Sequence, residues 1–222
     1  MTTKSAGRAA VLVLALALAS GPTEAAHAPK ASHAASRSQP AKTVQQASPV
    51  QQIQTFYDAL LDTMKQGPQL GAQGRYDKLK PVIEATFDLP FMTKVAVGPT
   101  WSSISPADQQ GLTAAFERMT IANYAHNFDS YSGEKFEVDP NVTDHPPDKL
   151  VKATLISDGD APVPFLHRMR ENNGVWKTID IYLNGYVSEL ATRRSEFATT
   201  LSSGGASALI KSINSSADKL MK

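Results

Sequence analysis

Apolar side chains recur at helical spacing along the part of the chain that follows residue 48. Ser48 and Pro49 form a typical helix start, since serine caps the first free amides and proline suits the first turn. Apolar residues then return every three or four positions until Gly67 and Pro68 interrupt the pattern. The pattern predicts an amphipathic helix between these two boundaries.

The same spacing predicts three further helices before the character of the chain changes. One covers 75–86, where Pro81 either kinks the helix or marks its true start. The next is capped by Asp88 and ends before the Gly-Pro pair at 98–99. Ser105, Pro106 and Asp108 form a further start signal, close to a capping box, for a long helix that runs through about Phe128. We expect these helices to precede all the strands.

After Gly133 the apolar period changes from helical to alternating, which is typical of strands with one buried face. Turn-forming residues, such as Asn172-Asn173-Gly174, separate the alternating runs. Consecutive strands joined by short turns pair antiparallel, because parallel neighbours need long crossovers. The predicted strands are 135–142, 149–156, 163–170 and 175–183.

Helical spacing returns in 186–201 and 206–220, with a Ser-Gly-Gly hinge at 203–205 between the two segments. Helices, then strands, then helices again indicate an α+β fold. We therefore expect several helices packed on an antiparallel sheet of four strands.

The first 25 residues have the layout of a secretory signal peptide. Lys4 and Arg8 precede an apolar run at 9–19, which is followed by small and helix-breaking residues. A run this short covers about 17 Å of a roughly 30 Å hydrocarbon core, which argues against an uncleaved anchor. Cleavage after Ala25 is favoured over cleavage after Ala28, because Pro29 directly follows the second site.

Residues 26–48 have Val44 as their single large aliphatic residue and contain no aromatic residue. Such a segment cannot bury enough apolar surface to offset the entropy lost on ordering. We expect a disordered tether at 26–48 and one folded domain at 49–222.

Composition and charge exclude several classes of protein. Lys and Arg total 22 against 21 for Asp and Glu, and no basic stripe is present, so we expect no nucleic-acid partner. Cysteine is absent, which excludes disulfides, thiolate metal sites and a lipoprotein anchor. No apolar run reaches the roughly 20 residues of a bilayer span, so a polytopic membrane protein is excluded.

Sequence motifs of common enzymes are absent: no G-x-S-x-G, H-E-x-x-H, G-x-x-x-x-G-K-[ST] or G-x-G-x-x-G occurs. His126, His145 and His167 have no acidic partner at metal-ligand spacing, so each is expected to be structural. Asp180 lies in the middle of a predicted strand. A carboxylate on the polar face of a half-exposed strand is its ordinary interpretation, and a general base is the alternative. We predict neither catalysis nor a bound metal or cofactor.

The apolar positions leave two arrangements open. The helices and the sheet either close on a dry core or stand apart and enclose an apolar ligand. A dry core is the commoner case, and composition alone does not choose between the two.

Five short segments follow one another in the order and spacing of a known family. They are Phe87-Asp88-Leu89-Pro90-Phe91-Met92, Val97-Gly98-Pro99-Thr100-Trp101, Tyr131-Ser132-Gly133, Trp176-Lys177-x-x-Asp180 and Arg194-Ser195-Glu196-Phe197. On these segments the chain resembles the MlaC and toluene-tolerance auxiliary family from about Val50 to Leu220. The stretch 183–197 is most similar to its hopanoid-associated branch, HpnM. Val97 and Arg193 depart from the family consensus, which has leucine and tyrosine at these positions.

The resemblance implies a soluble lipid carrier of the periplasm that works without catalysis. Its helices would pack on a curved antiparallel sheet around a deep apolar pocket. The implied cargo is a phospholipid for the MlaC branch and a hopanoid for the HpnM branch. The implied partners are an inner-membrane lipid transporter, of the ABC or the resistance-nodulation-division type, and an acceptor at the outer membrane. The alternative function is a ligand-free scaffold for a complex of lipid export or biosynthesis.

Strand alternation predicts which side chains line such a pocket, because alternate residues of a strand share one face. Two of the predicted helices supply the opposite wall. Several of these residues are expected to be plain core residues that touch no ligand. The predicted lipid-binding residues are Val151, Leu155, Val163, Phe165, Met169, Ile179, Ile181 and Leu183 on the sheet, with Phe91, Val95, Tyr124 and Phe128 on the helices.

Arg193 and Arg194 are adjacent charges in the predicted helix at 186–201. The ordinary interpretation is that they are solvated or that they pair with Glu196. A role in docking at the surface of a carrier is the alternative.

Overall fold

The computed structural model describes residues 47–222, so the predicted signal peptide at 1–25 and nearly all of the predicted tether at 26–48 lie outside the described residues. The described part begins with α1 (Pro49–Lys65). The backbone amide of Gln51 donates to the Ser48 hydroxyl, and the amide of Ser48 donates to the side-chain oxygen of Gln51. This reciprocal capping box confirms the predicted helix start.

The second helix, α2 (Gly67–Thr86), begins earlier than the predicted residue 75. The Gly-Pro pair that interrupts the apolar pattern opens this helix, because proline suits a first helical turn. Gly71 kinks the helix with φ 62° and ψ −179°, whereas Pro81 lies inside it and does not mark its start.

A tight contact fixes where α2 begins. A Cβ on Gly67 would collide with the backbone carbonyl of Asp129, so only glycine fits there. The buried Arg75 side chain donates from Nε to the Ala125 carbonyl at 2.7 Å and from Nη1 to the Gly67 carbonyl at 2.9 Å. Arg75 therefore joins the start of α2 to the end of the long helix α4.

The next elements are α3 (Leu89–Val97), the 3₁₀ turn η1 (Gly98–Ser103) and α4 (Pro106–Asn127). The Asp88 carboxylate accepts from the Phe91 amide at 3.1 Å, and the Ser105 hydroxyl accepts from the Asp108 amide at 3.1 Å. Both predicted caps are therefore confirmed.

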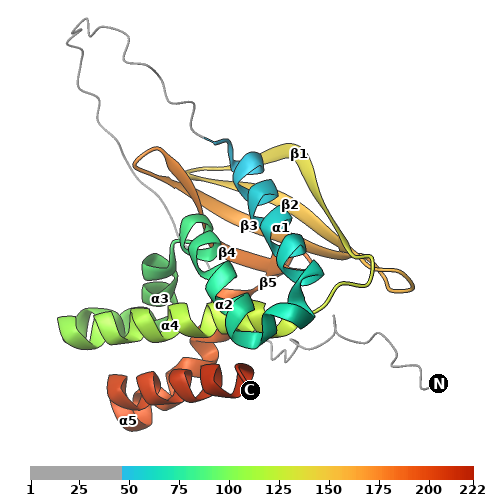
Figure 1. Ribbon diagram of the computed structural model, residues 1–222. Coiled ribbons are helices and arrows are strands. Elements are labelled where there is room, and N and C mark those ends of the chain that lie inside the picture. Colours follow the sequence, from blue (N-terminus) through green and yellow to red (C-terminus); the bar gives the residue numbers. More distant parts are fainter. Residues whose placement is uncertain (1–46) are drawn as a thin grey trace, which may run out of the picture. The chain divides into compact units, whose positions relative to one another are not determined.

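Five strands form one antiparallel sheet in the order of the sequence (Figure 1). The predicted α+β fold and its four-stranded meander are confirmed. The fifth strand has two residues, too few to leave an alternating pattern. The strands are β1 (Lys135–His145), β2 (Asp148–Ile156), β3 (Val163–Asn172), β4 (Val175–Leu183) and β5 (Val187–Ser188).

The last helix, α5 (Glu189–Leu220), folds back at Gly205, inside the predicted hinge. Gly205 has φ 67° and ψ −166°, a conformation nearly restricted to glycine. The helix starts later than the predicted residue 186, because Val187 pairs with Leu183 as part of the sheet. Beyond the kink α5 packs along α4 (Figure 1), where a Cβ on Gly111 would lie 2.9 Å from the side chain of Ile210.

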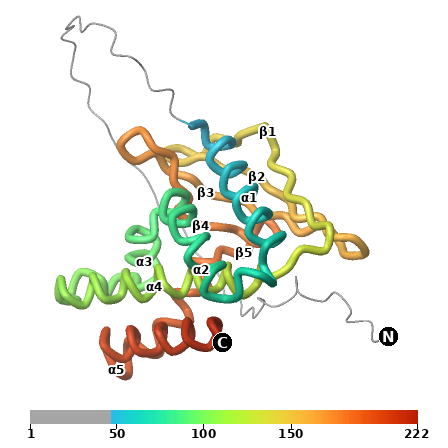
Figure 2. Tube along the Cα trace, in the orientation of Figure 1, coloured from blue at the N-terminus to red at the C-terminus, as the bar shows by residue number. Residues whose placement is uncertain are grey.

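The hydrophobic core lies between the helices and one face of the sheet. Figure 2 shows α1 crossing over the strands, and α1 contacts β1, β2 and β4. Within 47–222, none of the helices is both long and apolar enough to cross a membrane.

Candidate functional site

Five aromatic side chains form a closed ring of contacts where α1, α4 and β1 meet. The ring-centroid distances are 5.0 Å for Phe56–Tyr57, 4.2 Å for Tyr57–Phe136, 6.1 Å for Phe136–Phe128, 5.8 Å for Phe128–Tyr124 and 5.4 Å for Tyr124–Phe56. Aromatic pairs at such distances attract one another beyond their area burial. The sequence predicted Tyr124 and Phe128 as pocket residues but missed the other three, because a helical or alternating pattern does not show which aromatic residues converge.

Tyr124 combines a deep position with remaining accessible surface. Its ring packs against Phe56, Phe87 and Phe128, and burial raises the pKa of its hydroxyl well above the ordinary value. The residue is nevertheless only half-buried. Tyr124 therefore packs against the core and keeps part of its own surface accessible.

The structure brings most of the predicted lining residues to one core. Their placement falls into three groups, and their contact with a ligand stays a prediction. Val151, Leu155 and Met169 belong to the buried cluster, Val95, Tyr124, Phe128, Val163, Phe165 and Ile181 are partly buried and pack against it, and Phe91, Ile179 and Leu183 lie outside it.

A bulge in β4 changes the predicted face of Ile179. Arg168 pairs with Asp180 and the next residue, Met169, pairs with Thr178, so Ile179 is the extra residue between them. Thr178 therefore shares a face with Met169, and the prediction that Ile179 continues the face of the later residues of β4 is wrong. Alternation does not continue through a bulge.

His167 lies in the middle of β3 and is fully buried. The Tyr57 hydroxyl is 2.7 Å from its Nε2, and the Thr178 hydroxyl is 3.4 Å from its Nδ1. Burial lowers the pKa of His167 to about 3, so the imidazole is neutral near pH 7. These contacts agree with the predicted structural role. Among residues 47–222, no three side chains of the types that bind metals gather at one place.

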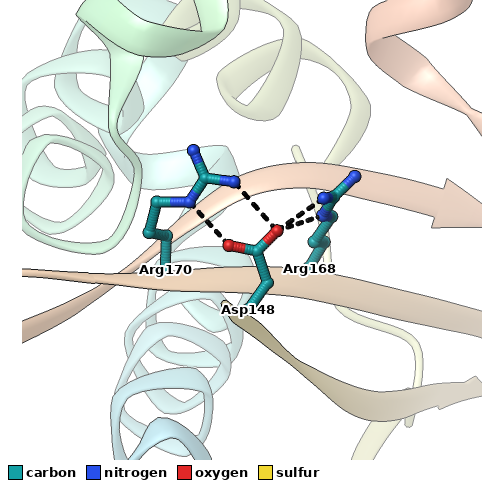
Figure 3. A network of polar contacts seen from close by, with 3 residues as sticks. All are labelled: Asp148, Arg168 and Arg170. Atoms are coloured by element: carbon teal, nitrogen blue, oxygen red, sulfur yellow. Dashed lines mark hydrogen bonds and ion pairs between the residues drawn. The ribbon is translucent and has the colours of Figure 1, made fainter. Parts of the chain in front are cut away.

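The Asp148 carboxylate is buried at the start of β2 and is held by two arginines of β3 (Figure 3). Nε of Arg168 donates to Oδ2 at 2.6 Å, while Nε and Nη2 of Arg170 donate to Oδ1 and Oδ2 at 2.6 and 3.0 Å. Burial acts to raise the pKa of this carboxyl, but the hydrogen bonds from Arg170 and Arg168 hold it below its ordinary value. The cluster links two neighbouring strands.

Phe91, on α3, lies against this arginine cluster. The Arg170 guanidinium is 5.0 Å from the centre of its ring, a distance typical of cation–π contacts. Arg170 alternates with Met169 along β3 and so projects from the opposite face of the sheet. Phe91 is therefore placed differently from the predicted wall residues Tyr124 and Phe128, which pack against the core.

Asp180 is buried, which corrects the prediction of a polar face on a half-exposed strand. Its carboxylate accepts from the Ser188 hydroxyl at 2.6 Å and from the amides of Ile181 and Leu190 at 2.8 and 3.2 Å. Burial raises the pKa of this carboxyl, against the effect of these hydrogen bonds. Asp180 thus fastens the first turn of α5 to β4.

Comparisons with known proteins identify the family. A family model described as MlaC protein matches residues 54–215. A solved structure of a phospholipid-binding protein from Ralstonia solanacearum, in complex with a phospholipid, is similar at 25% identity with a TM-score of 0.69, covering 79% of this chain and 100% of that chain. A search of curated proteins gives no significant match. Because the family model spans well over half of the 222 residues, the chain belongs to the MlaC family.

Proposed function

We propose that this chain is a lipid carrier, which takes up one lipid between its helices and its sheet and moves it between the inner and outer membranes without chemical change. MlaC proteins are periplasmic lipid-binding carriers and not enzymes, and the family match covers most of the folded domain. The observation that carries the proposal is the likeness to the phospholipid-bound protein from R. solanacearum, which extends over the whole of that chain.

The physical need for such a carrier is large. At about 0.8 kcal/mol per CH₂ group, a lipid of roughly 30 carbons costs on the order of 20 kcal/mol to expose to water. A carrier must offer an apolar enclosure in place of the bilayer. Tyr124, Phe128 and Phe165 suit this role, because they pack against the core and still keep accessible surface.

Phospholipid is the first candidate cargo, because the relative from R. solanacearum binds one. A hopanoid is the second, on the resemblance of 183–197 to the hopanoid-associated branch. The partners in this proposal are an inner-membrane lipid transporter, of the ABC or the resistance-nodulation-division type, and an acceptor at the outer membrane. Export depends on the leader at 1–25.

A ligand-free scaffold is the second candidate function, and the packing of one part of the predicted wall favours it. Val151 and Met169 have 0% of their surface exposed. If the rest of the core is packed as tightly as it is around these two residues, it has no room for a lipid. In that case the protein serves only to hold partner proteins together at the membrane.

Organic extraction of the purified mature protein, followed by mass spectrometry, separates the two functions. Lipid in stoichiometric amount supports the carrier, and its mass identifies a phospholipid or a hopanoid. Protein that is free of lipid, and that takes up none from vesicles containing either class, would contradict the carrier and favour the scaffold.

A further inference from the structure

A surface pocket of about 280 Å³ lies between the end of α3, η1 and the first half of α5. Its floor is apolar and continuous with the core, since Val97 is buried and Leu201 packs against the core cluster. Thr100 and Ser202 bring hydroxyl groups to the pocket, and Arg194 brings its positive charge. The pocket thus combines an apolar floor with a cationic rim.

The two adjacent arginines of α5 differ in their contacts. Nη1 of Arg193 lies 2.8 Å from Oε2 of Glu196, which forms an ion pair. Arg194, in contrast, makes no hydrogen bond or ion pair with any of residues 47–222. The sequence alone did not distinguish the two arginines, but the structure shows that, of the two, only Arg193 is ion-paired among the described residues. The Arg194 guanidinium is therefore available to a ligand.

Gly98 determines where this guanidinium lies. A Cβ on Gly98 would be 2.8 Å from Nε and 3.2 Å from Cζ of Arg194, so the side chain rests directly against the glycine backbone. Gly98 also has φ 75°, which disfavours other residues. Two of the segments that carry the family resemblance, 97–101 and 194–197, meet at this contact. It holds the guanidinium at the rim of the pocket.

We propose that this pocket binds the phosphate of a lipid headgroup, with Arg194 as its cationic partner. A guanidinium offers a planar fork of donors that matches phosphate oxygens, and hydroxyls such as that of Thr100 add further donors. The pocket has room for a headgroup and not for a whole lipid, so the acyl chains would lie toward the apolar floor at Val97. This inference rests on the proposed carrier function and selects a phospholipid over a hopanoid without phosphate.

The test offers the delipidated protein two lipids that differ in the phosphate. Vesicles contain equal amounts of phosphatidylglycerol and diacylglycerol with the same acyl chains, and mass spectrometry of the re-isolated protein gives the ratio bound. We expect the wild type to be enriched in phosphatidylglycerol. Arg194→Gln should lower the enrichment by roughly tenfold to one-hundredfold, in keeping with the usual value of a hydrogen bond to a charged group.

Arg193→Gln is the matched control, because it makes the same change of charge one residue away and should leave the enrichment unchanged. Melting temperatures of the variants verify that each folds. Enrichment that survives Arg194→Gln, or that falls equally in both variants, overturns the proposal. A protein that takes up neither lipid overturns this use of the pocket, and the carrier function itself is contradicted only if the same protein also takes up no hopanoid from vesicles.

Inorganic phosphate distinguishes a headgroup from the free ion. We expect that excess phosphate does not remove the enrichment, because the acyl chains add to the binding of the headgroup. If phosphate abolishes the enrichment, and shifts the Gly98 amide resonance in wild type but not in Arg194→Gln, the pocket is a site for the free ion and the proposal is wrong.

Discussion

The Tyr57 hydroxyl of α1 lies 2.7 Å from Nε2 of His167 in the middle of β3, and both side chains are buried in the core. A neutral imidazole has one donor and one acceptor nitrogen, so Tyr57 and Thr178 can satisfy both. This polar link fixes the first helix on the sheet at one point. Water does not reach it to replace a lost partner.

Tyr57→Phe removes the hydroxyl and leaves a ring nitrogen of His167 without its partner. Because a buried polar group without a partner is costly, we expect the free energy of unfolding to fall by about 1–3 kcal/mol. Urea denaturation measures the change. Tyr186→Phe is the control, since Tyr186 is 77% exposed, and it should change stability little. Equal stability of both variants would show that the link contributes nothing.

The depressed pKa of His167 predicts how stability depends on pH. The folded protein binds this proton only near pH 3, whereas the ordinary value is 6.5, so the unfolded chain binds more protons between these values. The free energy of unfolding therefore falls as the pH decreases from about 6.5 toward 3, by up to about 1.4 kcal/mol per unit. Urea denaturation at a series of pH values measures this slope.

His167→Gln is the matched comparison for the pH series. Asp180 and Glu189 have raised pKa values and act in the opposite direction, but they are present in both proteins and cancel in the difference. The lowered pKa of Asp148 changes the free energy of unfolding only when the pH falls below the ordinary carboxyl pKa of 3.8. The window from about pH 6 to about pH 4.5 lies between the ordinary pKa of 6.5 and the pKa of about 3 in the folded protein. A variant with the same slope as the wild type in this window would contradict the role of His167.

Asp148→Asn removes the charge on which Arg168 and Arg170 converge. The carboxylate is fully buried and accepts three charged hydrogen bonds, so we expect a loss of about 1–3 kcal/mol in the free energy of unfolding. Asp62→Asn serves as the control, because Asp62 pairs with Lys78 at the surface and such pairs contribute at most about 1 kcal/mol. Thermal melts at pH 7 would refute the prediction if both variants behaved alike.

Gly205→Ala tests the kink of α5 without creating a clash. No atom lies within 4 Å of the position of the added Cβ, but φ is 67° and ψ is −166°. Backbone strain alone should therefore cost about 1–3 kcal/mol. Ser203→Ala changes an exposed residue of the same hinge and should be nearly neutral. Unchanged stability of Gly205→Ala would mean that the two halves of α5 rearrange freely.

Local chemistry made most of the fold predictable from the sequence. The caps at Ser48, Asp88 and Ser105 lie within three residues of the amides that they accept from, so sequence spacing is sufficient to find them. The start of α2 was missed because the Gly-Pro pair at 67–68 marks the end of the preceding helix in the sequence pattern, whereas in the structure it also opens the next one. The bulge at Ile179 was missed because pairing between strands sets it.

In the candidate sites, too, features set by neighbouring residues were predictable and contacts between distant residues were not. Tyr124 and Phe128 lie one helical turn apart, so periodicity placed them together. The pocket beside Arg194 depends on the contact between Arg194 and Gly98, which are far apart in the sequence. The local sequence around either residue does not predict this contact. Only packing reveals that Glu196 pairs with Arg193 and that Arg194 has no ion pair within residues 47–222.

A matched pair of substitutions on β4 tests where the lipid lies. Ile181 is half-buried and packs against the core cluster, whereas Ile179, at the bulge, is only 3% exposed. If lipid occupies the space beside Ile181, the indole of Ile181→Trp takes that space, so the purified protein contains less lipid while the delipidated protein keeps its melting temperature. Ile179→Trp should instead overpack its surroundings and cost about 1–3 kcal/mol, or roughly 2–4 °C of melting temperature per kcal/mol. Lipid extraction and thermal melts on the same preparations give both quantities.

The contradicting outcome is that Ile181→Trp melts at as low a temperature as Ile179→Trp while its lipid content is unchanged. In that case this face of the sheet is dry core, and the lipid must lie on the other face, toward Tyr182 and Leu166.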